Sequence, residues 1–175
     1  MTTDFIELIR TRRSVRKFTD EPVSAEQIEL LKETALRSPT SRNFRPWQFV
    51  FVTDRKRLKT LSECKPHGAA FLAGAALGIV VCADETKSDV WVEDCSIASI
   101  MLQFTAQSLG LGSCWLQVRN RQHDNETSSE ESIRTLLNLP NNIRVLSIIG
   151  IGHPAEHPQT LAADSLPTDR ITDIN

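Results

Sequence analysis

Residues 91–118 read WVEDCSIASIMLQFTAQSLGLGSCWLQV and predict a long helix followed by a strand. From about Trp91 to Leu109, apolar residues recur at helical spacing around most of the circumference, which is typical of a buried helix, often packed against a partner. Gly110 is the expected C-terminal stop, because glycine readily adopts the left-handed conformation that ends many helices. The chain then enters a strand from Ser113 to Val118.

Two helices are expected before this stretch. A capping pattern at Asp4 and Glu7 begins the first helix. Its buried side is expected to consist of four apolar residues, namely Phe5, Ile6, Leu8 and Ile9. The second helix begins at the Ser24–Gln27 capping box, and Pro39 ends it near Arg37, because the residue before a proline avoids the helical conformation.

Shorter elements complete the pattern. Apolar runs predict three more strands, over Trp47–Val52, Leu77–Ala83 and Arg144–Ile151. Short helices are expected after Asp54 and over Glu130–Leu137. Because helices and strands alternate without strict βαβ units, the sequence predicts a single α+β domain over residues 1–175, with a mixed central sheet flanked by helices.

Composition is that of an ordinary globular protein. The length of 175 residues suits one domain, and a net charge of −2 gives no general attraction to nucleic acid or to a membrane. No apolar run reaches the length of a bilayer span, and acidic residues precede the N-terminal basic cluster, so we expect a cytoplasmic protein without a signal peptide. The four cysteines lie far apart and are expected to be buried free thiols rather than metal ligands.

The first chemical signal is Arg12-Arg13-Ser14-Val15-Arg16. If the chain is extended here, residues 12, 14 and 16 point the same way, so two guanidinium groups and one hydroxyl share a face. Forked charged donors beside a neutral donor suit a phosphate monoester. A solvated basic surface is an alternative interpretation. A nucleic-acid patch is a third, which the net negative charge and the lack of aromatic residues in the segment disfavour.

Two other segments gain meaning beside the basic one. The polar stretch 38–47, SPTSRNFRPW, offers hydroxyls and an amide on irregular backbone just before a strand, and such loops often carry ligand contacts. The Gly-x-Gly turn at Gly110 and Gly112 permits close backbone approach to a flat ligand. Each of these segments, taken alone, is also explained as an ordinary connection between two elements.

Four segments occur in a specific order: RTRRSVRKF (10–18), SPTSRNFRPWQF (38–49), GLGSCW (110–115) and IIGIGHP (148–154). Their order and spacing resemble the nitroreductase family of flavoproteins along nearly the whole chain. The resemblance implies a three-layer α/β/α sandwich and an intertwined homodimer, in which the tail from about 154–175 packs on the partner subunit. It also implies FMN as the cofactor and NADH or NADPH as co-substrate.

The resemblance implies a set of cofactor contacts. Arg12, Ser14 and Arg16 match the trio that binds FMN through its phosphate, ribityl chain and pyrimidine edge, and Arg13 lies beside them. Further contacts are implied at Pro39, Thr40, Ser41 and Asn43 from the other subunit, at Cys114, Trp115, Leu116 and Gln117 along the flavin ring, at Gly150 and Gly152 after the last strand, and at Arg170 near the phosphate. No side chain is expected to be catalytic, because the flavin carries the redox chemistry.

Two positions depart from the family's common pattern. Arg45 stands where the family loop commonly has glutamine. Thr168 stands where some members have a second late basic residue, so one phosphate charge is missing. The chain is also short for the family, which implies that insertions covering the substrate are small or absent.

The predicted activity is reduction of a small electron acceptor with hydride from NAD(P)H, by a ping-pong mechanism through FMN. The sequence does not choose among a nitroaromatic, a quinone, an enone and a flavin as acceptor. A non-catalytic flavin-binding or sensing module of the same fold is the alternative. The segment 150–155 fits G-x-G-x-x-A, but Pro154 and Pro158 argue against the helix that a Rossmann turn must open.

Overall fold

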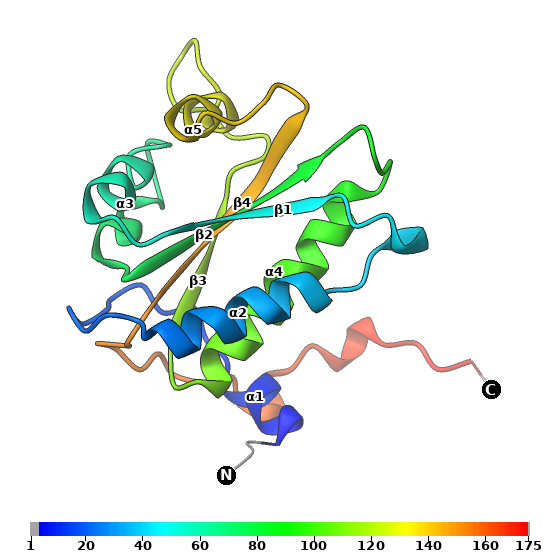
Figure 1. Ribbon diagram of the computed structural model, residues 1–175. Helices are drawn as coiled ribbons and strands as arrows, with labels where there is room; N and C mark the ends of the chain where they lie inside the picture. Colours follow the sequence, from blue (N-terminus) through cyan, green and yellow to red (C-terminus); the bar gives the residue numbers. More distant parts are fainter. Residues whose placement is uncertain (1–3, 175) are drawn as a thin grey trace.

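The computed structural model describes residues 4–174, which form a four-stranded sheet with helices on both faces (Figure 1). The strands are β1 (Trp47–Val52), β2 (Leu77–Asp84), β3 (Gly112–Gln117) and β4 (Ile143–Gly152), in the spatial order β1-β2-β4-β3. Each neighbouring pair is antiparallel. Every residue of β2 is buried, as its continuous apolar run predicted.

The sheet differs from the mixed sheet expected from the sequence. Helix α4 (Trp91–Ser108) connects β2 to β3, and these two strands run in the same direction. However, β4 lies between them and is antiparallel to both. Within residues 4–174, the one parallel pairing is an isolated bridge between Ser14 and Ser113. The α+β class is confirmed, but with an antiparallel sheet.

Helices cover the two faces of the sheet. Figure 1 shows α2 (Ala25–Arg37) beside α4 on one face, and α3 (Arg55–Leu61) and α5 (Ser129–Leu137) on the other. The core is divided accordingly. One cluster contains Leu31 of α2 with Leu102 of α4, and the other contains Leu58 of α3 with Ile133 of α5. This arrangement confirms the three-layer α/β/α sandwich.

The ends of the helices follow the capping rules. Ser24 Oγ accepts a hydrogen bond from the Gln27 N–H at 3.2 Å, and Gln27 Oε1 accepts one from the Ser24 N–H at 3.0 Å. Asp54 likewise caps α3 through the Arg57 N–H at 2.8 Å. Gly110 follows α4 with a left-handed φ of +76° and ends the helix, as predicted. Gly68, in the turn region after α3, has a similar left-handed φ of +79°.

Burial in α1 (Phe5–Thr11) differs from the expectation. Of the four apolar residues expected to be buried, only Leu8 is buried. The other three are exposed: Phe5 58%, Ile6 47% and Ile9 49%. The Phe5 ring meets the Phe104 ring of α4 edge-on, with 5.5 Å between centroids. The helix thus contacts α4 but leaves most of its apolar side uncovered in the single chain.

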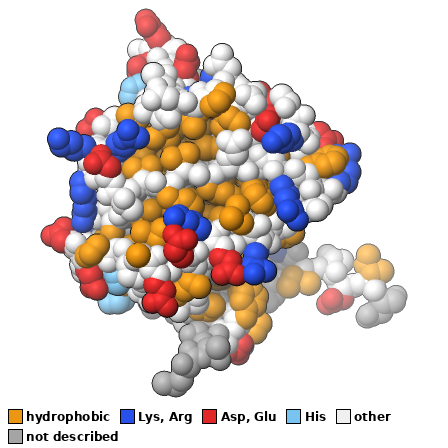
Figure 2. Space-filling view, viewed as in Figure 1, with side chains coloured by type: hydrophobic (Ala, Val, Ile, Leu, Met, Phe, Trp, Pro, Cys, Tyr) orange, Lys and Arg blue, Asp and Glu red, His pale blue; other side chains and the backbone are white. Residues whose placement is uncertain are grey.

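Exposed apolar residues continue along α4 and the tail. Ile97 and Ile100 are exposed and lie at helical spacing from Phe104, so they share its side of α4. Residues 154–174 leave the body as a mostly irregular segment (Figure 1), and its apolar residues Leu161, Leu166, Ile171 and Ile174 are exposed. Figure 2 shows further apolar surface in the middle of the face crossed by the edge strand β1. Apolar surface of this extent marks sites of association.

All four cysteines are free and buried, as predicted: Cys64, Cys82, Cys95 and Cys114. Among residues 4–174, no group of three or more histidine, cysteine or acidic side chains is arranged to hold a metal ion. No helix in this part of the chain combines the length and hydropathy needed to cross a membrane.

Candidate functional site

The basic segment is extended and lies beside β3. The Val15 N–H donates to the Ser113 carbonyl oxygen at 2.9 Å, within the parallel bridge between Ser14 and Ser113. Further along, the Thr19 N–H donates to the His153 carbonyl oxygen at 2.9 Å, which ties the segment to the end of β4. An extended backbone alternates its side chains, so the condition behind the phosphate prediction is met.

Ser14 pairs with Ser113 of β3, which places the segment with Arg12, Ser14 and Arg16 beside the strand that carries Cys114. Burial raises the pKa of the Cys114 thiol, whereas the Arg16 charge, the Ser14 hydroxyl and the Arg12 charge act to lower it. The fold brings the trio together with a strand that lies far away in the sequence.

The trio borders a surface hollow of about 360 Å³, together with Arg13, Glu156 and Pro158. The Glu156 carboxylate accepts hydrogen bonds from the N–H of Arg16 at 2.7 Å and from the N–H of Lys17 at 3.2 Å. Two consecutive N–H groups beside guanidinium groups thus bind an oxyanion in this structure. A phosphate offers the same kind of acceptor oxygen, so the donor set fits the phosphate of FMN.

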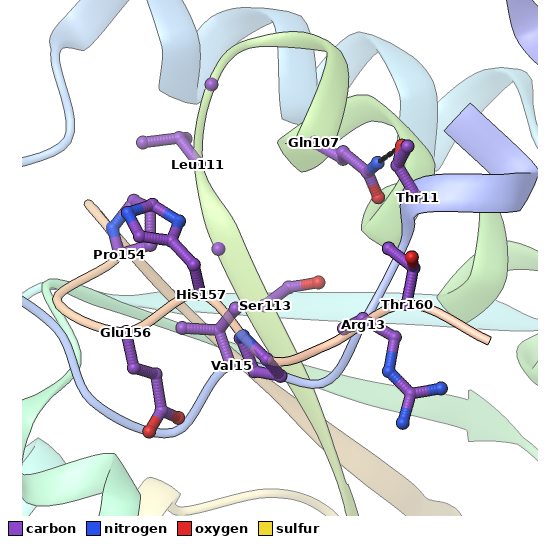
Figure 3. Close-up of a pocket in the computed structure, with 13 residues that line it drawn as sticks. Thr11, Arg13, Val15, Gln107, Leu111, Ser113, Pro154, Glu156, His157 and Thr160 are labelled. Atoms are coloured by element: carbon purple, nitrogen blue, oxygen red, sulfur yellow. Dashed lines mark hydrogen bonds between the residues drawn. The ribbon is translucent and has the colours of Figure 1, made fainter. Parts of the chain in front are cut away.

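Arg13 and Val15 border a second hollow of about 380 Å³, which lies between α1, the end of α4 and the tail (Figure 3). Gln107 Nε2 donates to Thr11 Oγ1 at 2.7 Å across this hollow and joins α4 to α1. Val15 packs on Gly112, where a Cβ would lie 2.8 Å from Val15 Cγ1. The Nε of Arg13 is buried and has no hydrogen-bond partner among the described residues. Arg13 borders both hollows, so its position does not show which of them its side chain serves. Its contact with FMN stays a prediction.

Residues 114–117 form most of β3, and the outer edge of this strand is open. One edge pairs with β4, and within residues 4–174 the other edge pairs only through the bridge at Ser113. Alternate N–H groups of an antiparallel strand point away from its partner, so β3 presents N–H groups at the open edge. Cys114 and Leu116 are buried, whereas Trp115 donates to Gln117 Oε1 at 3.2 Å. This edge suits the ring contacts predicted for the four residues.

Lys65 also reaches this strand, although the sequence analysis did not identify it. Its Nζ donates to the Gln117 carbonyl oxygen at 3.1 Å. Burial lowers the pKa of Lys65, and the thiols of Cys64 and Cys114 act in the opposite direction. No local pattern marks this lysine, because its position beside β3 depends on a contact between distant parts of the chain.

The loop 38–46 is strained and firmly held. Three of its residues have left-handed φ values: Arg42 50°, Asn43 58° and Arg45 49°. Such conformations cost roughly 1–3 kcal/mol each for residues with a side chain, and they cluster at functional sites. The Ser41 N–H donates to Oδ1 of the buried Asp94 at 2.8 Å, and the Arg45 N–H donates to Thr40 Oγ1 at 3.0 Å. The loop therefore keeps one shape.

This loop and the basic segment lie at opposite ends of α4. Asp94, which binds the loop, is in the first turn of α4, and Gln107, which binds Thr11, is in the last. At a rise of about 1.5 Å per residue, these two anchors are roughly 20 Å apart along the helix. Within one chain, the loop therefore lies far from Arg12, Ser14 and Arg16. The four loop residues predicted to contact FMN are Pro39, Thr40, Ser41 and Asn43.

Gly150 and Gly152 are explained by packing inside this chain. A Cβ on Gly150 would lie 2.6 Å from Cε2 of Phe71, and a Cβ on Gly152 would lie 3.0 Å from the ring of Phe18. The close approach that each glycine permits is made by an aromatic ring of the same chain. Both glycines lie within β4 and not in a turn after it, and their contact with FMN stays a prediction.

Arg170 does not join the site within one chain. It lies in the exposed 3₁₀ turn Thr168–Arg170, and its Nε is 3.4 Å from Asp169 Oδ2. The tail carries this turn away from the body of the molecule (Figure 1), and the contact of Arg170 with the FMN phosphate stays a prediction.

The sequence and the fold both match known nitroreductases. Residues 9–65 and 58–153 match the profile of the Nitroreductase family. A protein of Archaeoglobus fulgidus, named as a candidate NADH dehydrogenase/NAD(P)H nitroreductase, is 38% identical over 163 residues, which cover 91% of this chain and 90% of that protein. The FMN reductase [NAD(P)H] of Bacillus subtilis is 28% identical, over 87% of this chain and 67% of that protein.

A solved structure extends the match to the whole fold. The FMN-dependent nitroreductase of Clostridium difficile superposes with a TM-score of 0.95 at 39% identity, covering 98% of this chain and 99% of that one. The chain belongs to the nitroreductase family. This membership confirms the predicted enzyme class, an NAD(P)H-dependent oxidoreductase with FMN as cofactor.

Proposed function

We propose that this chain takes hydride from NADH or NADPH and reduces a small acceptor such as a nitroaromatic, a quinone, an enone or a flavin. When bound, FMN supplies the two-electron redox chemistry that connects the two half-reactions. Donor and acceptor use the same face in turn, which gives ping-pong kinetics. The observation that carries the proposal is that Arg12, Ser14 and Arg16 line one hollow beside the open edge of β3.

In this proposal the side chains bind and polarise the cofactor. Arg12, Ser14 and Arg16 bind the phosphate, ribityl chain and pyrimidine edge, and the N–H groups of residues 114–117 lie along the ring. Fixed positive charge from Arg12 and Arg16 stabilises negative charge that develops on reduction, because preorganised charges need no reorientation during the reaction. No side chain has to act as a nucleophile or a general base, so we assign no catalytic residue.

We further propose a homodimer with a shared FMN site. Across a twofold axis perpendicular to α4, the α4 helices of two protomers pack antiparallel. The loop at the N-terminal end of one α4 then lies beside the basic segment at the C-terminal end of the other. Exposed Ile97 and Ile100 supply the apolar contact. Within one chain the loop and the basic residues Arg12, Ser14 and Arg16 are separated by roughly 20 Å along α4. In the dimer, the loop of one protomer would lie next to these residues of the other.

Titration of the apoprotein with FMN tests the cofactor site. Arg16→Ala should weaken binding at least about tenfold, the loss expected for one charge-assisted hydrogen bond. Lys17→Ala is the matched control, because residue 17 points to the other side of the extended segment, and it should weaken binding less than about threefold. Equal losses would show that only net charge matters. Absence of saturable binding by the wild-type protein at micromolar FMN would contradict the proposal itself.

Light scattering at micromolar protein tests the shared site. Ile100→Glu should give a monomer and weaken FMN binding in parallel, because a charge would be buried between the two α4 helices. Thr135→Glu adds the same charge at an exposed position on α5, on the opposite face of the sheet, and should change neither property. A stable wild-type monomer that binds FMN tightly would refute the shared site.

Steady-state kinetics test the mechanism. With NAD(P)H and a quinone varied together, double-reciprocal plots should be parallel, because the oxidised nicotinamide leaves before the acceptor binds. Intersecting lines would show that both substrates bind at once and would exclude a single shared face.

A further inference from the structure

Arg45 makes two hydrogen bonds within the loop 38–46, in the position where the family commonly has glutamine. Its backbone N–H donates to Thr40 Oγ1 at 3.0 Å, and its side-chain Nε donates to Asn43 Oδ1 at 2.9 Å. The residue therefore holds both the shape of the loop and the side chain of Asn43.

The bond to Asn43 fixes which way its amide faces. A guanidinium N–H can only donate, so the atom of Asn43 that meets Arg45 must be the carbonyl oxygen. The NH₂ group then faces away from Arg45, and no residue within 4–174 accepts a hydrogen bond from it. Asn43 is exposed, so these two N–H donors are available to a ligand.

The backbone keeps this arrangement in place. Asn43 and Arg45 both have left-handed φ values, 58° and 49°. Asparagine adopts this conformation readily, whereas arginine does so only when its surroundings hold it. The Asn43 N–H donates to the Thr40 carbonyl oxygen at 3.2 Å, and Ser41 is bound to the buried Asp94. The amide of Asn43 is thus presented on a rigid support.

We propose that Arg45 is a positioning residue, which locks the Asn43 amide so that it donates hydrogen bonds to acceptor atoms of FMN in the site shared with the partner subunit. This inference rests on the proposed function. The pyrimidine edge of a flavin carries carbonyl oxygens and ring nitrogens as acceptors and one N–H as a donor. An amide locked with its NH₂ outward favours the acceptors, and a freely rotating amide does not.

Two variants separate the hydrogen bond from the charge. Arg45→Gln removes the charge but keeps a side-chain N–H that can donate to Asn43 Oδ1, whereas Arg45→Met removes both. In FMN titrations of the apoprotein, we expect Arg45→Met to weaken binding about tenfold and Arg45→Gln to stay within about twofold of wild type. Light scattering and thermal unfolding of both variants should match the wild-type protein, because neither substitution touches the core.

A double-mutant cycle tests whether Arg45 acts through Asn43. Asn43→Ala should weaken FMN binding by a factor similar to Arg45→Met, and adding Arg45→Met to Asn43→Ala should cause no further loss. Equal losses in Arg45→Gln and Arg45→Met, additive losses in the double variant, or a lowered melting temperature in Arg45→Met would each overturn the positioning role. If wild-type protein fails to bind FMN, or Asn43→Ala binds it normally, the proposed shared site fails first, and the two failures are therefore distinguishable.

Discussion

Replacing Gly112 with alanine should disturb the FMN site through Val15, the residue between Ser14 and Arg16. A Cβ on Gly112 would lie 2.8 Å from Cγ1, 2.9 Å from Cβ and 3.1 Å from Cγ2 of Val15, whereas ordinary contacts are 3.4–4 Å. Val15 is buried, and its N–H is bound to the Ser113 carbonyl oxygen, so it cannot simply rotate away. The basic segment must shift by roughly half an ångström or more to relieve such overpacking.

The expected cost is measurable in two assays. Overpacking of a buried contact lowers the free energy of unfolding by about 1–3 kcal/mol, which urea unfolding resolves. FMN affinity should fall as well, because the displaced segment carries Ser14 and Arg16. Gly74→Ala is the matched control: nothing lies within 4 Å of a Cβ at Gly74. That control should leave FMN binding unchanged and raise stability by at most about 1 kcal/mol.

A second substitution tests the cause. Val15→Ala removes two of the three atoms that the new Cβ would strike and leaves the Val15 Cβ at 2.9 Å, so Gly112→Ala should cost less in the Val15→Ala background, although some cost should remain. The same loss in both backgrounds would refute the reasoning, as would a Gly112→Ala protein with the stability and FMN affinity of the wild type.

Three further outcomes are expected from urea unfolding. Gly110→Ala should lower stability by about 1–2 kcal/mol, since φ of +76° is unfavourable for alanine. Asp94→Asn should lower stability by about 1–3 kcal/mol and weaken FMN binding, because one of the acceptor oxygens that bind Ser41 N–H and Ser88 Oγ is lost. For Glu130, burial acts to raise the pKa, but hydrogen bonds from Arg144 and the backbone lower it overall. Because the pKa is lower in the folded state, ionised Glu130 adds to the free energy of unfolding at pH values above its ordinary pKa of 4.5. This contribution is lost as the pH falls through the folded-state pKa, so the free energy of unfolding of Glu130→Gln should fall less steeply at acid pH.

Local signals in the sequence were sufficient for most elements. The capping box at Ser24 and Gln27, the apolar run of β2 and the glycine at 110 each depend on neighbouring residues, and each prediction was confirmed. The alternation of residues 12, 14 and 16 is local as well, and these three side chains line one hollow in the structure.

Features that depend on distant contacts were not predictable in the same way. The antiparallel sheet results from β4 lying between β2 and β3, which no local pattern encodes. The glycines at 150 and 152 are needed because Phe71 and Phe18 pack on them, and Lys65 matters because it meets Gln117. The apolar side of α1 was predicted to be buried, but Phe5, Ile6 and Ile9 are exposed, because a pattern in one chain does not say whether the same chain covers that side.

The buried cysteines have a consequence for the chemistry around this enzyme. Burial raises the pKa of Cys64 to about 11 and of Cys82 to about 12, and it raises the pKa of Cys95 as well. Only the thiolate is a good nucleophile, so these thiols stay inert at neutral pH. Electrophiles such as quinones react with thiolates, so the buried thiols of Cys64, Cys82 and Cys95 should react slowly with them. For the same reason, a cysteine introduced at exposed Thr135 would react selectively and could carry a spectroscopic label on native protein.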